Sequence, residues 1–187
     1  MKKLLIALTM VLVLLTGCNK EKEEPREEVV ITKVESFAVD MSRYRNMSST
    51  NHQFVGITPE TFLNLLKAGG NGIIYVGDSG CPVCNRAVPV LNDAAQELGV
   101  TVYYIDCYHP VYPLMEYINE FIAATKPILN VHDGEPTVFT PHVFTVVNGE
   151  FVDSLIGIGE LDPETSEEDY QELKDTYMGM MDYFKVD

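Results

Sequence analysis

The hydrophobic and polar positions of this chain form blocks that predict strands and helices in turn. The strand-like blocks are short apolar runs bounded by turn residues, at 54–57, 73–76, 100–105, 143–147 and 151–156. The last two runs flank Asn148-Gly149, a dipeptide that favours the tight turn of a β-hairpin. We therefore expect a sheet whose last two strands are antiparallel neighbours.

The helical blocks carry apolar residues three and four positions apart. They cover residues 81–98, 114–124 and about 168–184. Thr58-Pro59-Glu60 predicts one more helix start, because it places a hydroxyl at the N-cap, a proline at the first helical position and an acid in the first turn. Strands and helices in this order predict an α/β fold, with a central mixed β-sheet flanked by helices on both faces.

The first residues have the order of features found in a secretion signal. Lys2 and Lys3 precede an apolar run, residues 4–15, that is too short to span a bilayer comfortably. Leu15-Thr16-Gly17-Cys18 resembles the lipobox of bacterial lipoproteins, which implies cleavage before Cys18 and lipid attachment to its sulfur. An ordinary signal peptide and a short membrane anchor are the alternatives. We expect residues 1–18 to be a lipoprotein signal, and the mature protein to be lipid-anchored at the extracytoplasmic face of the cell membrane.

The rest of the chain divides into a tether and one domain. Residues 19–28 are a charged run with no apolar face, so we expect 19–53 to be a flexible tether followed by an N-terminal extension. The folded domain is expected at 54–187. With 28 acidic against 13 basic residues, the formal charge is −15 and no basic stripe is available for a phosphate backbone. Nucleic acid is therefore not an expected partner.

A pair of cysteines lies in the predicted turn between the strand at 73–76 and the helix that follows, in the motif Cys81-Pro82-Val83-Cys84. A thiolate at a helix start is stabilised by free backbone N–H groups and by the helix dipole. Two thiols at this spacing can close a small disulfide and reopen it, which indicates a redox site that needs no other cofactor. A permanent disulfide is the alternative; a four-thiolate zinc site is excluded, because the chain has no second Cys-x-x-Cys.

These features resemble a thioredoxin fold, and the resemblance extends beyond the two cysteines to about residues 54–187. Pro89 lies five residues after Cys84, where thioredoxins carry a kinking proline. Thr140-Pro141 precedes the hairpin, like the family's cis-proline, and Gly157 closes the last strand. More narrowly, the Gly-x-x-x-Cys-Pro-x-Cys spacing and the lipoprotein leader resemble the bacteriocin transport accessory proteins.

The chain departs from the thioredoxin pattern around the cysteines. Thioredoxins usually have a buried Asp six residues before the first cysteine, and here that position holds Tyr75. This puts the usual proton transfer from the second thiol in doubt. Asp78 and Asp106 are alternative proton acceptors, although acids in turns more often cap the backbone. The chain between Cys84 and Pro141 is also longer than in thioredoxins, so an insertion is expected within 106–135, before the cis-proline strand.

The resemblance and the helix position imply a role for each site residue. Cys81 is the expected nucleophile, and Cys84 the thiol that resolves the mixed disulfide. Pro141 is expected to be cis, with the Thr140 backbone pairing with an extended substrate. Pro82, Val83, Asp78 and Tyr75 are the expected neighbours of the thiols. Val83 offers the Cys81 thiolate neither charge nor hydrogen bond, so the direction of electron transfer stays open.

Two further residues have alternative interpretations. Cys107 follows a strand end at the same sheet edge as the redox turn, and is either a third redox thiol or a buried inert side chain. His142 follows the predicted cis-proline. With Cys81 and Cys84, and with His109 as a further candidate, it would suit copper or zinc; a solvent-facing strand histidine is the alternative.

The sequence thus predicts a membrane-tethered thiol–disulfide oxidoreductase that acts on extracytoplasmic protein thiols and disulfides. After each reaction, a membrane or thioredoxin-type redox partner would return the Cys81–Cys84 pair to its starting redox state. The alternative is a non-catalytic thioredoxin-like accessory or metal-binding module.

Overall fold

The computed structural model describes residues 29–184. The predicted signal peptide, the predicted lipidation site Cys18 and the charged run at 19–28 lie outside the described residues. Within residues 29–184, no helix has the length and apolar character needed to cross a membrane.

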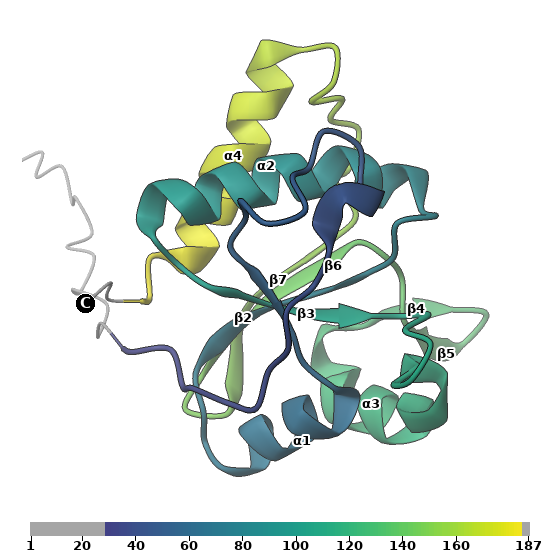
Figure 1. The fold of residues 1–187 in the computed structure, drawn as a ribbon. Coiled ribbons are helices and arrows are strands. Elements are labelled where there is room, and N and C mark those ends of the chain that lie inside the picture. The colour runs from purple at the N-terminus through teal and green to yellow at the C-terminus, as the bar shows by residue number, and fades with distance from the viewer. Residues whose placement is uncertain (1–28, 185–187) are drawn as a thin grey trace, which may run out of the picture.

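A five-stranded sheet, in the order β1-β3-β2-β6-β7, forms the centre of the molecule (Figure 1). Its strands are β1 (Phe54–Gly56), β2 (Gly72–Gly77), β3 (Val102–Asp106), β6 (His142–Val147) and β7 (Glu150–Ile156). The strands β1, β3 and β2 are parallel, while β6 runs antiparallel to both β2 and β7. This mixed sheet is the one expected from the sequence, and with helices on both faces it makes a thioredoxin fold.

Helices cover the two faces of the sheet in pairs. The helices α2 (Pro82–Leu98) and α4 (Glu167–Met181) lie on one face, above the sheet in Figure 1; α1 (Pro59–Lys67) and α3 (Ile118–Thr125) lie on the other. Helix α1 begins where the sequence predicts. Thr58 is its N-cap, and its side chain accepts a hydrogen bond from the Thr61 N–H.

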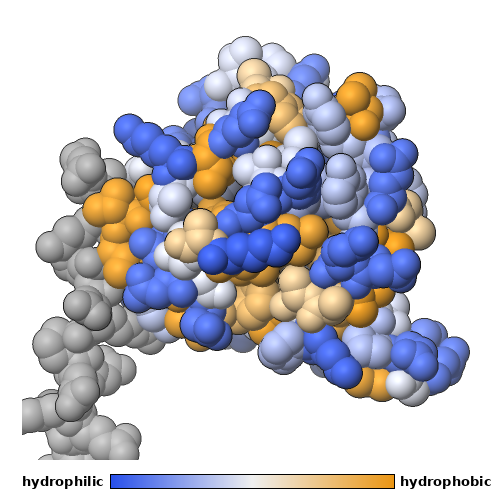
Figure 2. All heavy atoms as spheres, turned by 90° about the horizontal axis from the view of Figure 1, so that it is seen from below, coloured by the Kyte–Doolittle hydropathy of each residue, from blue (hydrophilic) through white to orange (hydrophobic). Residues whose placement is uncertain are grey.

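Strand alternation divides the core into two clusters. Tyr75 and Val143 point towards α2 and α4, whereas Val76 and Phe144, the next residues along the same strands, point towards α1 and α3. Each fully buried large apolar side chain contributes about 1.5–3 kcal/mol. The face on the α1 and α3 side carries small groups of apolar residues between charged ones (Figure 2).

The insertion between β3 and β6 has more regular structure than the sequence predicts. A 3₁₀ turn at Leu114–Tyr117 leads into α3, where one continuous helix was expected, and β4 (Asn130–His132) pairs with β5 (Glu135–Thr137) in a small hairpin. Asp133 and Gly134 both have positive φ, which a tight turn requires. Strands of three residues are too short to show an alternating pattern, so the sequence indicates only a loop here.

The segment before β1 packs against the α2 face of the domain. The sequence predicts only a flexible tether and an N-terminal extension for residues 19–53. Instead Met41, within a 3₁₀ turn at Met41–Arg43, is fully buried, and Tyr44 is 3% exposed. The Arg45 N–H also donates to the Asn85 side chain at the start of α2, at 2.8 Å. Two apolar residues among polar neighbours show no periodic pattern, so their burial is visible only in the structure.

Candidate active site

The turn from β2 to α2 places Cys81 at the N-cap of α2. Its sulfur accepts the Cys84 N–H at 3.3 Å, the position that a capping hydroxyl ordinarily takes. The preceding turn is held by Asp78, whose carboxylate accepts the Gly80 N–H at 2.8 Å and whose carbonyl accepts the Cys81 N–H at 3.3 Å. A negative charge on the Cys81 sulfur is therefore stabilised by the helix start.

The two thiols of the motif have different surroundings. Cys81 is partly exposed, whereas Cys84 is fully buried, and both are free thiols. Burial raises the pKa of Cys84 to about 11, and the nearby Tyr75 hydroxyl acts in the opposite direction. Cys84 is thus a protonated thiol near neutral pH, and Cys81 is the thiol that a substrate can reach.

The loop before β6 brings Thr140 against the nucleophile. The Thr140–Pro141 peptide bond is cis, as the resemblance implies. The Cys81 thiol donates to the Thr140 carbonyl at 3.6 Å, across 59 residues of sequence. The Gly157 N–H donates to the Pro141 carbonyl at 2.7 Å, which ties this loop to the end of β7.

Depressions open on both sides of Thr140. One, of about 350 Å³, is lined by Val83, Phe139 and the glycine-rich end of β7. The other, of about 360 Å³, is lined by Asp78, Cys107 and apolar residues of the insertion. Thr140 lines both depressions, and the insertion shapes the second one.

A cluster of tyrosines occupies the place of the missing buried acid. Tyr75 is fully buried, and its hydroxyl donates to the Tyr44 hydroxyl at 3.2 Å. The Tyr44 hydroxyl is also 2.8 Å from the Tyr104 hydroxyl. Sequence reasoning named Tyr75 as a neighbour of the thiols, but it missed Tyr44, which lies in the N-terminal segment and carries no signal of its own.

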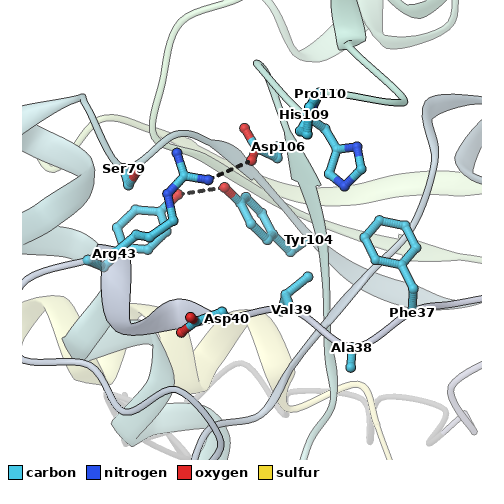
Figure 3. A pocket seen from close by; sticks show the side chains of 11 residues that line it. Phe37, Ala38, Val39, Asp40, Arg43, Ser79, Tyr104, Asp106, His109 and Pro110 are labelled. Carbon is cyan, nitrogen blue, oxygen red and sulfur yellow. Dashed lines mark hydrogen bonds and ion pairs between the residues drawn. The ribbon is translucent and has the colours of Figure 1, made fainter.

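Asp106 lies where this cluster meets the surface. Tyr44, Tyr104, Arg43 and Asp106 are among the residues lining a cavity of about 220 Å³ (Figure 3). The Arg43 guanidinium is 3.9 Å from the Asp106 carboxylate, and the Asp106 side chain is only 13% exposed. Asp78 and Asp106 both cap their own turns, and Asp106 also places its carboxylate at the wall of this cavity.

Cys107 lies close to the redox pair and, like Cys84, is a protonated thiol. Burial raises its pKa to about 12, and the carboxylates of Asp78 and Asp106 add to this effect. The thiol is therefore protonated at neutral pH, which disfavours it as an attacking nucleophile.

His142 does not approach the thiols, so Cys81, Cys84 and His142 do not form the copper or zinc site that the sequence offers as an alternative. Because side chains alternate along a strand, His142 points to the α1 and α3 face with Phe144, while Cys84 packs in the α2 cluster. His142 is also fully buried rather than solvent-facing, with Nε2 2.8 Å from the Ser154 hydroxyl. His109 stacks on Tyr112 instead. Among residues 29–184, no group of three or more His, Cys, Asp or Glu side chains is arranged to hold a metal.

No protein-family model matches the chain. Among solved structures, thioredoxin O2 from Arabidopsis thaliana covers 71% of this chain and 98% of its own, at 15% identity and a TM-score of 0.45. Thioredoxin from Aeropyrum pernix covers 54% of this chain and 73% of its own, at 28% identity and a TM-score of 0.38. A mutant thioredoxin from Halobacterium salinarum covers 75% and 99%, at 13% identity and a TM-score of 0.43.

Proposed function

We propose that this protein is a thiol–disulfide oxidoreductase that acts on protein thiols and disulfides through Cys81 and Cys84. The observation that carries the proposal is the asymmetry of the pair. A partly exposed sulfur caps a helix and faces the Thr140 carbonyl, and a buried, protonated thiol lies one turn further on.

In the reducing direction the reaction has two steps. The Cys81 thiolate attacks one sulfur of a substrate disulfide; the substrate S–S bond breaks, and the other substrate sulfur leaves as a thiolate that takes up a proton. Cys84 then loses its proton and attacks the Cys81 sulfur. The Cys81–Cys84 disulfide forms, the second substrate thiolate leaves, and two electrons have passed to the substrate. The oxidising direction is the reverse of these steps.

The proposal includes a place of action. Lipidation of Cys18 would hold the domain at the extracytoplasmic face of the cell membrane, which suits substrates with disulfides. The order of Lys2, Lys3, the apolar run and the lipobox supports this part. A membrane or thioredoxin-type partner would then return the pair to its starting redox state.

The test is the equilibrium reduction potential of residues 19–187 in glutathione buffers. We expect a reversible two-electron couple that is lost in Cys81→Ser and in Cys84→Ser and is kept in the matched variant Cys107→Ser. A potential near about −270 mV would identify a reductase, and one near about −120 mV a disulfide donor. A chain with no reversible couple would contradict the enzyme and favour a non-catalytic accessory module.

A further inference from the structure

The resolving step needs a way for the proton of buried Cys84 to leave, and the structure contains a chain of hydroxyl groups that starts beside it. We propose that Tyr75, Tyr44 and Tyr104 relay this proton to the cavity beside Asp106. The relay deepens the proposed function and rests on it, because it serves the attack of Cys84 on the mixed disulfide.

The hydroxyl chain is continuous and held in place by its rings. The Tyr75 hydroxyl donates to Tyr44 at 3.2 Å, and Tyr44 is 2.8 Å from Tyr104. The Tyr75 and Tyr104 rings stack with centroids 5.2 Å apart, and the Tyr44 ring meets both edge-on. Gly77 leaves the space for the Tyr75 hydroxyl, since a Cβ there would lie 2.1 Å from that oxygen.

The inner end of the chain meets the thiol. Cys84 has no exposed surface, so bulk water does not reach its sulfur directly. Tyr75 and Cys84 lie in the same buried cluster, and the Tyr75 hydroxyl lowers the pKa of the Cys84 thiol. Because burial holds the pKa of Tyr75 well above 10, Tyr75 stays neutral: as its own proton passes to Tyr44, its oxygen takes the proton of Cys84 and then donates it in a hydrogen bond to the new thiolate.

The outer end of the chain opens to a cavity. Tyr44, Tyr104 and Asp106 line the cavity of about 220 Å³ described above, which is large enough for water. In Figure 3 the Asp106 carboxylate faces the Arg43 guanidinium, and the Tyr104 hydroxyl, which also donates to the Gly77 carbonyl at 3.5 Å, lies at the wall of the same cavity. A proton that reaches Tyr104 can therefore pass to Asp106 or to water there.

The transfer balances because a hydroxyl is both donor and acceptor. Each tyrosine oxygen takes one proton from the preceding group and gives its own to the next, so every tyrosine ends neutral. The net change is one proton moved from the Cys84 sulfur to the Asp106 carboxylate or to cavity water. The electrons move only in the disulfide exchange between Cys84 and Cys81.

Phenylalanine variants test the relay, because they keep each ring and remove each hydroxyl. A disulfide-linked fluorescent leaving group is placed on Cys81, and its release by Cys84 is followed by stopped flow from pH 6 to 10. We expect Tyr75→Phe and Tyr44→Phe to slow the release at pH 7 by about a hundredfold, the low end of a general acid–base contribution. The rate should recover as the pH rises, while alkylation of Cys81 stays unchanged.

The matched control is Tyr103→Phe. Tyr103 is on β3 as Tyr104 is, but it faces the opposite side of the sheet, and its hydroxyl donates to the Thr32 carbonyl at 2.6 Å. This variant should release the leaving group at the wild-type rate. If Tyr75→Phe slows the release and Tyr44→Phe does not, the effect comes only from the interaction between the Tyr75 hydroxyl and Cys84, and the relay is wrong. Unchanged rates in both variants also overturn it. A wild-type protein with no release contradicts the proposed function itself.

Discussion

At the scale of single residues, Cys81, Cys84 and Cys107 differ in their exposure and in the charges beside them. Cys81 caps a helix and is partly exposed, Cys84 is buried beside Tyr75, and Cys107 is partly buried beside two carboxylates. Burial disfavours the charged thiolate, and neighbouring negative charges add to that cost. The differences in exposure and pKa therefore support the proposed roles, with Cys81 as the nucleophile and Cys84 as the resolving thiol.

The first prediction concerns the reactivity of Cys107. At pH 7 its thiolate fraction is very small, because its pKa is raised to about 12. Iodoacetamide should therefore label Cys81 at least about tenfold faster than Cys107, since the thiolate is the reacting form. Timed alkylation followed by peptide mass mapping measures both rates in one sample. Equal labelling would mean that Cys107 is an active third thiol.

The second prediction concerns stability at acid pH. Burial lowers the pKa of His142 to about 4 in the folded protein, compared with 6.5 for an unperturbed histidine. Between these values the unfolded chain binds the additional proton, so stability falls as the pH drops from about 6.5 to about 4. The total from this residue is roughly 3 kcal/mol. Urea unfolding at several pH values should show a flatter profile for His142→Gln, and identical profiles would contradict this account.

At the scale of elements, the end of β2 and the start of α2 position the site together. The strand supplies Tyr75 and ends at Gly77, and the helix carries Cys84 in its first turn. Pro89 lies inside the same helix, where the sequence places it. The close approach between Gly77 and the Tyr75 hydroxyl links the geometry of the strand end to that of the tyrosine cluster.

The third prediction tests this close approach. Gly77→Ala would place a methyl group 2.1 Å from the Tyr75 hydroxyl oxygen, so the ring or the backbone must shift. Overpacking of this kind typically costs about 1–3 kcal/mol, measured here by urea unfolding. Gly179→Ala is the control: it lies in α4, and its added methyl meets no atom within 4 Å. We expect it to be neutral or stabilising by up to about 1 kcal/mol.

At the scale of the whole molecule, two segments outside the strand–helix core complete the site. The N-terminal segment supplies Tyr44 to the hydroxyl cluster and Met41 to the core. The insertion supplies the apolar wall of the depression beside Thr140, with Met115 62% exposed. In the proposed reaction, the insertion shapes the surface that a substrate meets beside Cys81, and the N-terminal segment supplies Tyr44 to the proton relay from Cys84.

The fourth prediction is that the N-terminal segment unfolds together with the domain. Met41→Ala removes a fully buried side chain and should lower the free energy of unfolding by about 2–5 kcal/mol. Met115→Ala, which changes an exposed side chain, should alter it by less than about 0.5 kcal/mol. Both are measured by urea unfolding of residues 19–187. A Met41→Ala protein as stable as the wild type would mean that the segment is peripheral.

The sequence by itself determined what depends on local patterns. Short apolar runs predicted the five strands of the sheet, and apolar residues three and four positions apart predicted α2, α3 and α4, because burial imposes a local pattern on each element. The cysteine pair was likewise predicted at the strand-to-helix turn, since its flanking strand and helix adjoin it in sequence. The start of α1 was predicted from Thr58 and the residues after it, because an N-cap side chain bonds to the backbone only a few residues away.

Only the tertiary structure decided which distant side chains meet. Cys81 and Thr140 are separated by 59 residues, and Tyr75 and Tyr44 by 31, so no local period links them. The face that His142 occupies follows from the strand register, which places His142 with Phe144 and apart from Cys84. The pKa values of Cys84 and Cys107 depend on burial by segments far away in sequence, which is why the chemistry of the site became visible only when the chain was folded.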